Sequence, residues 1–280
     1  MSRVFQVQTT CRFEVEDLAK QIPGFTLGWA RLSCPFGFGA GPSGHMAAPN
    51  SAIARYVNEK KVPQLFISAG TDKWSDYQHF PWTMRFQPSF RTEGQIYANI
   101  LKEKPDAKIA ILYQDDDLGK DYLAGMRDVM GDKFDKIVVT ASYDPTVDSQ
   151  IISLQAAGAN VLLAATTTKF AVQAIRKVHD LDWKPLFLMS NVSASVGAVL
   201  KPAGPENAIG IITDAYLKDS TDRTWKNDAG MNEWRDFIAK YMPGADTSDG
   251  SYVFAYTLSK AYQSTGASRT SSRRLGHLHG

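Results

Sequence analysis

Cysteine is scarce in this chain: Cys11 and Cys34 are the only two among 280 residues. Two cysteines are too few for a disulfide-rich scaffold, and their spacing matches no zinc-binding motif. We interpret them as free structural thiols, while a bond between the two stays open. A chain of this length needs no covalent staples, because it can bury roughly three quarters of its unfolded surface.

Long apolar runs are also missing. No stretch of about 18 apolar residues exists, so the sequence predicts no membrane-spanning helix. The start, "MSRVFQVQTTCRFEVEDLAK", carries charges where an export signal needs an apolar stretch. No export signal is therefore predicted in this chain, although an exported protein whose signal had been removed or altered would read the same way.

A strong excess of either charge is absent as well. The formal net charge is +2, and much of that excess lies in the tail "SRTSSRRLGHLHG". A nearly balanced charge argues against nucleic acid or an anionic membrane surface as the main partner.

Recognisable catalytic and metal-binding motifs are lacking. There is no G-x-S-x-G elbow and no S-x-x-K with its companion motifs. The histidines form no ligand cluster along the chain; they are His45, His79, His179, His277 and His279. We therefore predict no metal, no cofactor and no enzymatic activity.

One glycine-rich segment matches a nucleotide-binding spacing. Gly39, Gly41 and Gly44 fit G-x-G-x-x-G, with which a helix start can approach a pyrophosphate. The residues before it make a poor strand, and no acid follows at the distance that a ribose contact needs, since Asp72 is too far along. We interpret the segment as a flexible loop and keep a nucleotide-dependent enzyme as a weaker alternative.

The central part of the chain alternates short apolar runs with amphipathic stretches, which is typical of βα units around a parallel sheet. The runs are nearly all apolar, as expected of strands covered on both faces. They lie at 63–68, 108–114, 136–142, 160–166, 185–190 and 208–213. By contrast, residues 1–45 and the tail 266–280 show little periodicity, and we expect less order there.

Three consecutive acids, Asp115, Asp116 and Asp117, stand between a predicted strand and a predicted helix. Carboxylates before a first helical turn accept hydrogen bonds from its unpaired N–H groups. A hard cation would need oxygen ligands at spaced positions, which "DDDLGK" does not supply. We predict a helix cap and no metal site.

Several segments together resemble one family: "NEKKVPQLFISAGT", "PWTMRFQPSFRTEGQIYANIL", "KIAILYQDDDLGKDYLAGM", "YDPTVDSQIISLQAAGANVLLAATTTKFAVQAIRKV", "VLKPAGPENAIGIIT" and "WRDFIAKYMP". They are similar to substrate-binding proteins of branched-chain amino acid type ABC transporters, the leucine-binding or type I periplasmic binding proteins. The resemblance spans roughly residues 47–264.

The resemblance implies an α/β fold of two lobes, each a parallel sheet flanked by helices. Residues 46–113 and 246–265 would form lobe 1 and residues 114–245 lobe 2, with 1–45 an atypical N-terminal segment and 266–280 a basic tail. The family supplies further βα units before the matching segment. It therefore implies that the first lobe is incomplete.

The resemblance also implies a ligand site in an interlobe cleft. "SAGT" matches the loop that holds the ligand carboxylate, which assigns Ser68, Ala69 and Thr71 to that role, and Tyr256 matches a cleft tyrosine. The other three positions depart from the leucine-binding members. Leu118 and Thr166 stand where those members carry tyrosines, and Asn191 stands where they carry the acid that pairs with the ligand ammonium.

The resemblance implies an extracytoplasmic solute-binding protein of an ABC importer, located in the periplasm and partnered by the permease membrane subunits. Its ligand is predicted to be a small carboxylate, either an amino acid or an aromatic or aliphatic acid. Asn191 offers only a neutral dipole, so we expect an acid without an α-amino group to be preferred. An amino acid ligand would need another acid, Glu206 or Asp214. A sensory ligand-binding module remains the alternative function.

Overall fold

The computed structural model describes residues 47–143 and 146–264. The chain divides into two compact units, Met1–Gln87 and Pro88–Gly280. Several predictions fall outside the described residues: those on the glycine segment at 39–44, on both cysteines, and on the two ends of the chain. The lobe boundaries that the resemblance implies stay a prediction.

In the described part of the first unit, a helix precedes two short parallel strands with a 3₁₀ turn between them. The elements are α3 (Ala47–Glu59), β1 (Gln64–Ile67), η1 (Asp72–Ser75) and β2 (Thr83–Arg85). Their small apolar core consists of Ala54, Ile67, Ala69 and Trp74, with Phe80 packed against it.

Strand β1 contains a bulge. Gln64 pairs with Thr83 and Ile67 with Arg85, so β1 has one more residue than β2 between the two pairs. Phe66 absorbs the extra residue with φ +59°, a value that few non-glycine side chains adopt. The predicted strand at 63–68 is thus present but irregular.

The second unit is built on a five-stranded parallel sheet with the order β4-β3-β5-β6-β7. The strands are β3 (Ile109–Gln114), β4 (Val138–Tyr143), β5 (Val161–Ala165), β6 (Leu186–Met189) and β7 (Ile212–Thr213). The predicted parallel sheet of consecutive βα units is confirmed. Because β3 pairs with both β4 and β5, the chain first adds a strand on one side of β3 and then builds on the other side.

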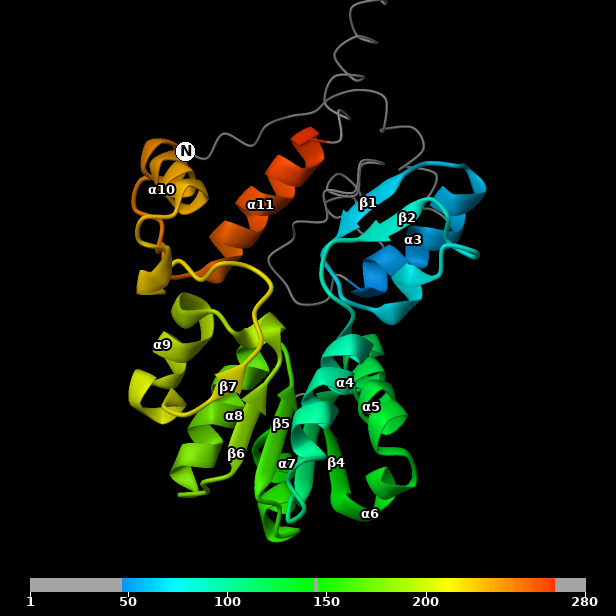
Figure 1. Ribbon diagram of the computed structural model, residues 1–280, viewed down its shortest axis with the longest axis vertical. Helices are drawn as coiled ribbons and strands as arrows, with labels where there is room; N and C mark the ends of the chain where they lie inside the picture. The colour runs from blue at the N-terminus through cyan, green and yellow to red at the C-terminus, as the bar shows by residue number, and fades with distance from the viewer. Residues whose placement is uncertain (1–46, 144–145, 265–280) are drawn as a thin grey trace, which may run out of the picture. The chain divides into compact units, whose positions relative to one another are not determined.

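Helices cover both faces of this sheet, as Figure 1 shows with α8 on one side and α4 and α5 on the other. In β3, Ile109 and Ile111 pack on the face covered by α4 and α5, which we call the first face. Ala110 and Leu112 pack on the opposite, second face, which α8 covers. The first face carries α4 (Phe90–Leu101), α5 (Asp117–Met130), η2 (Gly131–Lys133) and α6 (Phe134–Ile137), and the second carries α7 (Asp148–Ala156), α8 (Thr168–Asp180) and α9 (Lys201–Ala203). The nearly continuous apolar runs of the strands follow from this double coverage.

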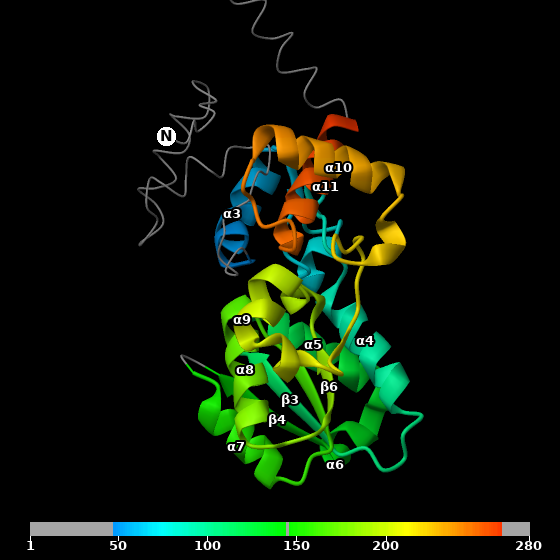
Figure 2. The ribbon, with the colours of Figure 1, turned by 90° about the vertical axis from the view of Figure 1, so that its left-hand side faces the viewer.

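The connections after β6 and β7 are short turns. They are η3 (Asn191–Ser193), the π-helix η4 (Val196–Leu200), η5 (Pro205–Ala208) and η6 (Arg223–Trp225). The chain then ends its described part with α10 (Ala229–Tyr241) and α11 (Gly250–Ser264), which pack on each other through Met231, Trp234, Ile238 and Val253. Figure 2 shows these two helices side by side.

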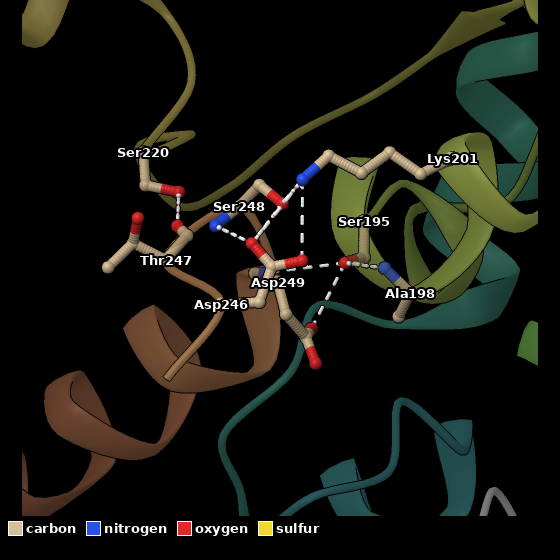
Figure 3. A network of polar contacts seen from close by, with 9 residues as sticks. Ser195, Ala198, Lys201, Ser220, Asp246, Thr247, Ser248 and Asp249 are labelled. Atoms are coloured by element: carbon tan, nitrogen blue, oxygen red, sulfur yellow. Dashed lines mark hydrogen bonds and ion pairs between the residues drawn. The ribbon is translucent and has the colours of Figure 1, made fainter. Parts of the chain in front are cut away.

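A polar network fixes the turn that precedes α11 to η4 (Figure 3). The Ser195 hydroxyl accepts from the backbone N–H of Ala198 and of Gly250, each at 3.1 Å, and donates to Asp249 Oδ1 at 3.0 Å. Lys201 Nζ donates to Ser248 Oγ at 2.6 Å. A hydroxyl has one donor and two acceptor sites, so Ser195 uses its full capacity.

Two local predictions were wrong. The predicted strand at 208–213 is reduced to its last two residues, because Gly210 takes φ +88° and interrupts the extended run. Strand β4 starts at Val138, since the preceding residues form the short helix α6.

Candidate functional site

The carboxyl-terminal edge of the five-stranded sheet is where a ligand site is expected in the second unit. In open parallel sheets ligands bind beyond the strand ends, at the point where the strand order reverses. Here that point lies between β3 and β5. The residues that follow these two strands and the neighbouring β6 are therefore the candidates for ligand contact.

The turn between β3 and α5 holds the three consecutive acids. Asp116 is the N-cap: its Oδ1 accepts from the N–H of Leu118 at 3.0 Å and of Gly119 at 3.4 Å. Asp115 forms an exposed ion pair with Lys120, and Asp117 begins the helix. The predicted helix cap is confirmed. Among residues 47–143 and 146–264, no group of three or more His, Cys, Asp or Glu residues is arranged to hold a metal ion.

Across the switch point, β5 ends in a run of threonines. Thr167 donates to Gln114 Oε1 at 3.3 Å, which joins the ends of β5 and β3. Thr166 is fully buried, and its hydroxyl has no hydrogen-bond partner among the described residues. A buried unpaired hydroxyl is costly. It is also the kind of group that a bound ligand can satisfy.

Asn191 follows β6 and lies between two carboxylates. Its backbone N–H donates to Glu93 Oε1 at 2.9 Å, and its side-chain Nδ2 donates to Glu93 Oε2 at 2.6 Å. The same Nδ2 lies 3.3 Å from Asp214 Oδ2. Glu93 is only 2 % exposed, so this acid is inside the protein and beside a predicted ligand-binding position.

Tyr97 connects this cluster to the ends of β6 and β7. Its hydroxyl lies 2.8 Å from the Met189 carbonyl oxygen and 2.9 Å from Asp214 Oδ1, and it accepts from the Asp214 N–H at 3.1 Å. The hydroxyl has one proton, so it donates to one of the two oxygens at a time. Asp214 is thereby held at a fixed place next to Asn191.

Burial and mutual charge perturb the titration of this cluster. Burial raises the pKa of Glu93 well above its usual 4.5, and the neighbouring Asp214 raises it further. Burial and the charges of Asp214 and Glu93 also raise the pKa of Tyr97. The buried Tyr122 hydroxyl lies near Glu93 and Ser190 without a well-formed hydrogen bond to either. The raised pKa favours the protonated form of Glu93 beside Asp214, which lowers the repulsion between the two carboxyl groups.

The three predicted ligand-binding residues of the second unit, Leu118, Thr166 and Asn191, have different surroundings. Leu118 is 5 % exposed and belongs to the apolar cluster between the sheet, α4 and α5. The turn that carries Asn191 is joined to the end of β5, because the Ser193 hydroxyl in this turn donates to the Thr166 carbonyl oxygen at 2.7 Å. The ligand contacts of all three residues stay predictions.

In the first unit, the "SAGT" loop follows β1. Ala69 is packed in the small apolar core, and Ser68 is half-buried. Thr71 is 2 % exposed, and its hydroxyl has no hydrogen-bond partner among the described residues. Like Thr166, Thr71 therefore has a buried hydroxyl without a partner among the described residues. Its role in holding a carboxylate stays a prediction.

Tyr256 lies on α11 and contacts α10. Its ring centroid is 5.2 Å from that of Phe237. Burial raises the pKa of the Tyr256 hydroxyl, and the neighbouring Glu233 raises it further. These contacts place one side of the ring in the α10–α11 packing. The predicted cleft role of Tyr256 stays a prediction.

Sequence reasoning missed Glu93 and Tyr97 and named Asp214 only as a fallback. A signal was present: Glu93, Tyr97 and Leu101 stand four residues apart in α4, and all three are buried on one stripe of that helix. An acid on an otherwise apolar stripe indicates a buried partner. The partners, Asn191 and Asp214, are distant in sequence and could not be read from it.

Comparisons with solved structures find several proteins of like fold. A branched chain amino acid ABC transporter from Thermus thermophilus with bound valine has a TM-score of 0.64 and 12% sequence identity, and the match covers 76% of this chain and 55% of that chain. A possible leucine/isoleucine/valine-binding protein from Rhodopirellula baltica SH 1 has a TM-score of 0.60 at 16% identity, with 73% and 57% covered. A fatty acid ABC transporter substrate-binding protein from Thermomonospora curvata has a TM-score of 0.59 at 15% identity, with 75% and 54% covered.

These matches show a shared fold, and the chain spans little more than half the length of each of the three structures. The fold is the predicted type I periplasmic binding protein fold, with parallel sheets flanked by helices. No curated protein matches the chain. None of the helices in the described ranges is both long and apolar enough to cross a membrane.

The comparison with protein families matches residues 42–274, well over half of the chain, to one family whose fold serves solute binding and is generally not enzymatic. The α/β architecture, the parallel strand order and the likeness to substrate-binding proteins agree with that match. The chain therefore belongs to the periplasmic binding protein family.

Proposed function

We propose that this chain is the solute-binding component of an ABC importer and that it binds a small carboxylate-bearing ligand. The family match and the transporter proteins of like fold support this role. The observations that carry the proposal are two buried threonine hydroxyls without a partner among the described residues: Thr166 directly follows strand β5, and Thr71 stands four residues after the end of strand β1. Partnership with permease subunits and a periplasmic location belong to the same proposal.

The chemistry of the two threonines suits an anionic group. A hydroxyl that finds no protein partner can donate to a ligand oxygen and recover the cost of its burial. Each lies in a loop after a parallel strand, which is where ligands bind in other open parallel sheets. The two loops belong to different units, and each is tested separately.

Calorimetric titration with leucine, valine, hexanoate and benzoate tests the proposal. We expect micromolar affinity for at least one of these carboxylates. Thr71→Val and Thr166→Val each remove a hydroxyl at nearly constant volume, so each should weaken binding while leaving the free protein as stable or more stable. Thr257→Val is the matched control, since the Thr257 hydroxyl is already paired with the Val253 carbonyl oxygen at 2.8 Å.

No binding of any of the four carboxylates would contradict the ligand class. Binding that survives both threonine substitutions would contradict the site, since the unpaired hydroxyls would then play no part in holding the ligand.

A further inference from the structure

The donors of the Asn191 side chain are fully used. Its amide nitrogen has two hydrogens, and this nitrogen lies 2.6 Å from Glu93 Oε2 and 3.3 Å from Asp214 Oδ2. The backbone N–H of the same residue is also taken, by Glu93 Oε1 at 2.9 Å. Every N–H group of Asn191 therefore meets a carboxyl oxygen.

This arrangement determines that the oxygen of the Asn191 side-chain amide, and not its nitrogen, has no hydrogen bond to the two acids. An amide oxygen only accepts, so turning it toward two carboxyl groups would set acceptor against acceptor. A proton on Glu93 does not change the choice, because both Glu93 oxygens already accept from Asn191, Oε1 from the backbone N–H and Oε2 from Nδ2. Asn191 Oδ1 is thus directed away from both acids, and no described residue donates a hydrogen bond to it.

The surroundings hold this geometry from three sides. The Tyr97 hydroxyl contacts Asp214 Oδ1 and accepts from the Asp214 N–H. The Ser190 hydroxyl accepts from the Val192 N–H at 3.3 Å, and the Ser193 hydroxyl is bound to the Thr166 carbonyl oxygen. The turn that carries Asn191 is therefore preorganised, and through Ser193 it is joined to the main chain of Thr166.

We infer that Glu93 and Asp214 are positioning residues that hold Asn191 with its side-chain oxygen as the hydrogen-bond acceptor of the ligand site. The site then selects a ligand that carries a hydrogen-bond donor, an ammonium or a hydroxyl, besides its carboxylate. This inference rests on the proposed function. It also reverses the expectation from the sequence that an acid lacking an α-amino group is preferred, because that expectation counted Asn191 without the two acids behind it.

The positioning role is tested without any ligand. In a ¹⁵N–¹H spectrum at pH 7, the two side-chain amide protons of Asn191, assigned with Asn191→Leu, should be shifted downfield and exchange slowly. Glu93→Gln should move one of them and Asp214→Asn the other, since each substitution replaces one acceptor carboxyl. Glu233→Gln is the matched control, because Glu233 is an exposed acid that pairs with Lys260.

Side-chain amide shifts at ordinary values, or shifts that neither Glu93→Gln nor Asp214→Asn alters, would overturn the positioning role. This result does not depend on ligand binding, so it separates a failure of the inference from a failure of the proposed function.

Selectivity is tested with three probes of one carbon skeleton: leucine, 2-hydroxy-4-methylpentanoate and 4-methylpentanoate. We expect the first two to bind about tenfold or more tightly than the third. Glu93→Gln should reduce this ratio by about tenfold, because the NH₂ group of the introduced amide can donate to Asn191 Oδ1 and let the asparagine amide turn over. A purely structural role would lower all three affinities equally. Tighter binding of 4-methylpentanoate than of leucine to the unsubstituted protein would overturn the donor preference.

Discussion

Gly125 of α5 lies against the backbone of Arg91 in α4, so closely that a Cβ on Gly125 would stand 2.0 Å from the Arg91 carbonyl oxygen. Gly94 of α4 has a similar relation to Tyr122, whose carbonyl oxygen a Cβ would approach to 2.6 Å. The two helices are therefore in backbone contact on one face of the sheet. This contact keeps Glu93 and Tyr97 of α4 beside the ends of β6 and β7.

Gly125→Ala is expected to destabilise the protein by about 1–3 kcal/mol or more, because overpacking against rigid backbone forces the helices apart. Gly230→Ala in α10 is the control: its Cβ would meet nothing closer than an Asp228 oxygen at 3.4 Å, and alanine favours a helix over glycine by roughly 0.5–1 kcal/mol. Urea denaturation of the three proteins measures both effects. Equal stability of the Gly125→Ala and unsubstituted proteins would refute the tight contact.

The sheet of the second unit was predictable because its strands are short apolar runs bounded by turn residues, and because their double burial removes any polar alternation. The first unit was less readable. Strand β2 was missed, since "TMR" is only three residues long and has no pattern of its own. The register of β1 depends on the bulge at Phe66, whose positive φ no propensity predicts.

The site was predictable only in part. Strand ends are countable in a sequence, so Thr166 and Asn191 could be placed at one edge before the fold was known. The partners of Asn191 could not, because Glu93 lies 98 residues away and Asp214 is held by Tyr97 across a distance of 117 residues. Long-range hydrogen bonds of this kind depend on the packing of α4 against the sheet, which sequence periodicity alone does not determine.

The helix cap before α5 supplies a second prediction. Asp116→Ala should lower the free energy of unfolding by about 1 kcal/mol, since the N–H groups of Leu118 and Gly119 lose their acceptor. Asp115→Ala should change it by less than about 0.5 kcal/mol, because the ion pair with Lys120 is largely exposed. Thermal and urea unfolding compare the two. A larger loss at Asp115 than at Asp116 would contradict the cap assignment.

The network in Figure 3 leads to a third prediction. Ser195→Ala leaves the N–H groups of Ala198 and Gly250 without an acceptor, which should cost about 1–3 kcal/mol. The Gly250 amide begins α11, so its hydrogen exchange should become faster in the variant. Ser251→Ala is the control, because Ser251 is exposed and one residue further along. Unchanged protection at Gly250 would show that Ser195 does not fix the start of α11.

The buried acid in α4 makes stability depend on pH. Burial and Asp214 raise the pKa of Glu93 above its ordinary 4.5, so over the interval between the two values the folded protein binds a proton that the unfolded chain has lost. The stabilising contribution of that proton is complete below pH 4.5 and is lost as the pH rises through the folded pKa. The groups facing Glu93 are Asn191, Asp214, Tyr97 and Tyr122.

Glu93→Gln is expected to resemble the unsubstituted protein near pH 4.5, where the side chain it replaces is neutral, and to become the more stable of the two as the pH rises. The difference should grow by at most about 1.4 kcal/mol per pH unit, the limit for one titrating group. Glu233→Gln should differ from the unsubstituted protein by a nearly constant amount over this range, because the Lys260 ammonium lowers the pKa of the Glu233 carboxyl and its contribution to stability therefore changes only below about pH 4.5. Urea denaturation from about pH 4.5 to about pH 8 measures both slopes. The stability difference between Glu93→Gln and the unsubstituted protein could instead stay constant over this range. Glu93 would then have the same pKa in the folded and unfolded states, which would contradict the effect of its burial beside Asn191 and Asp214.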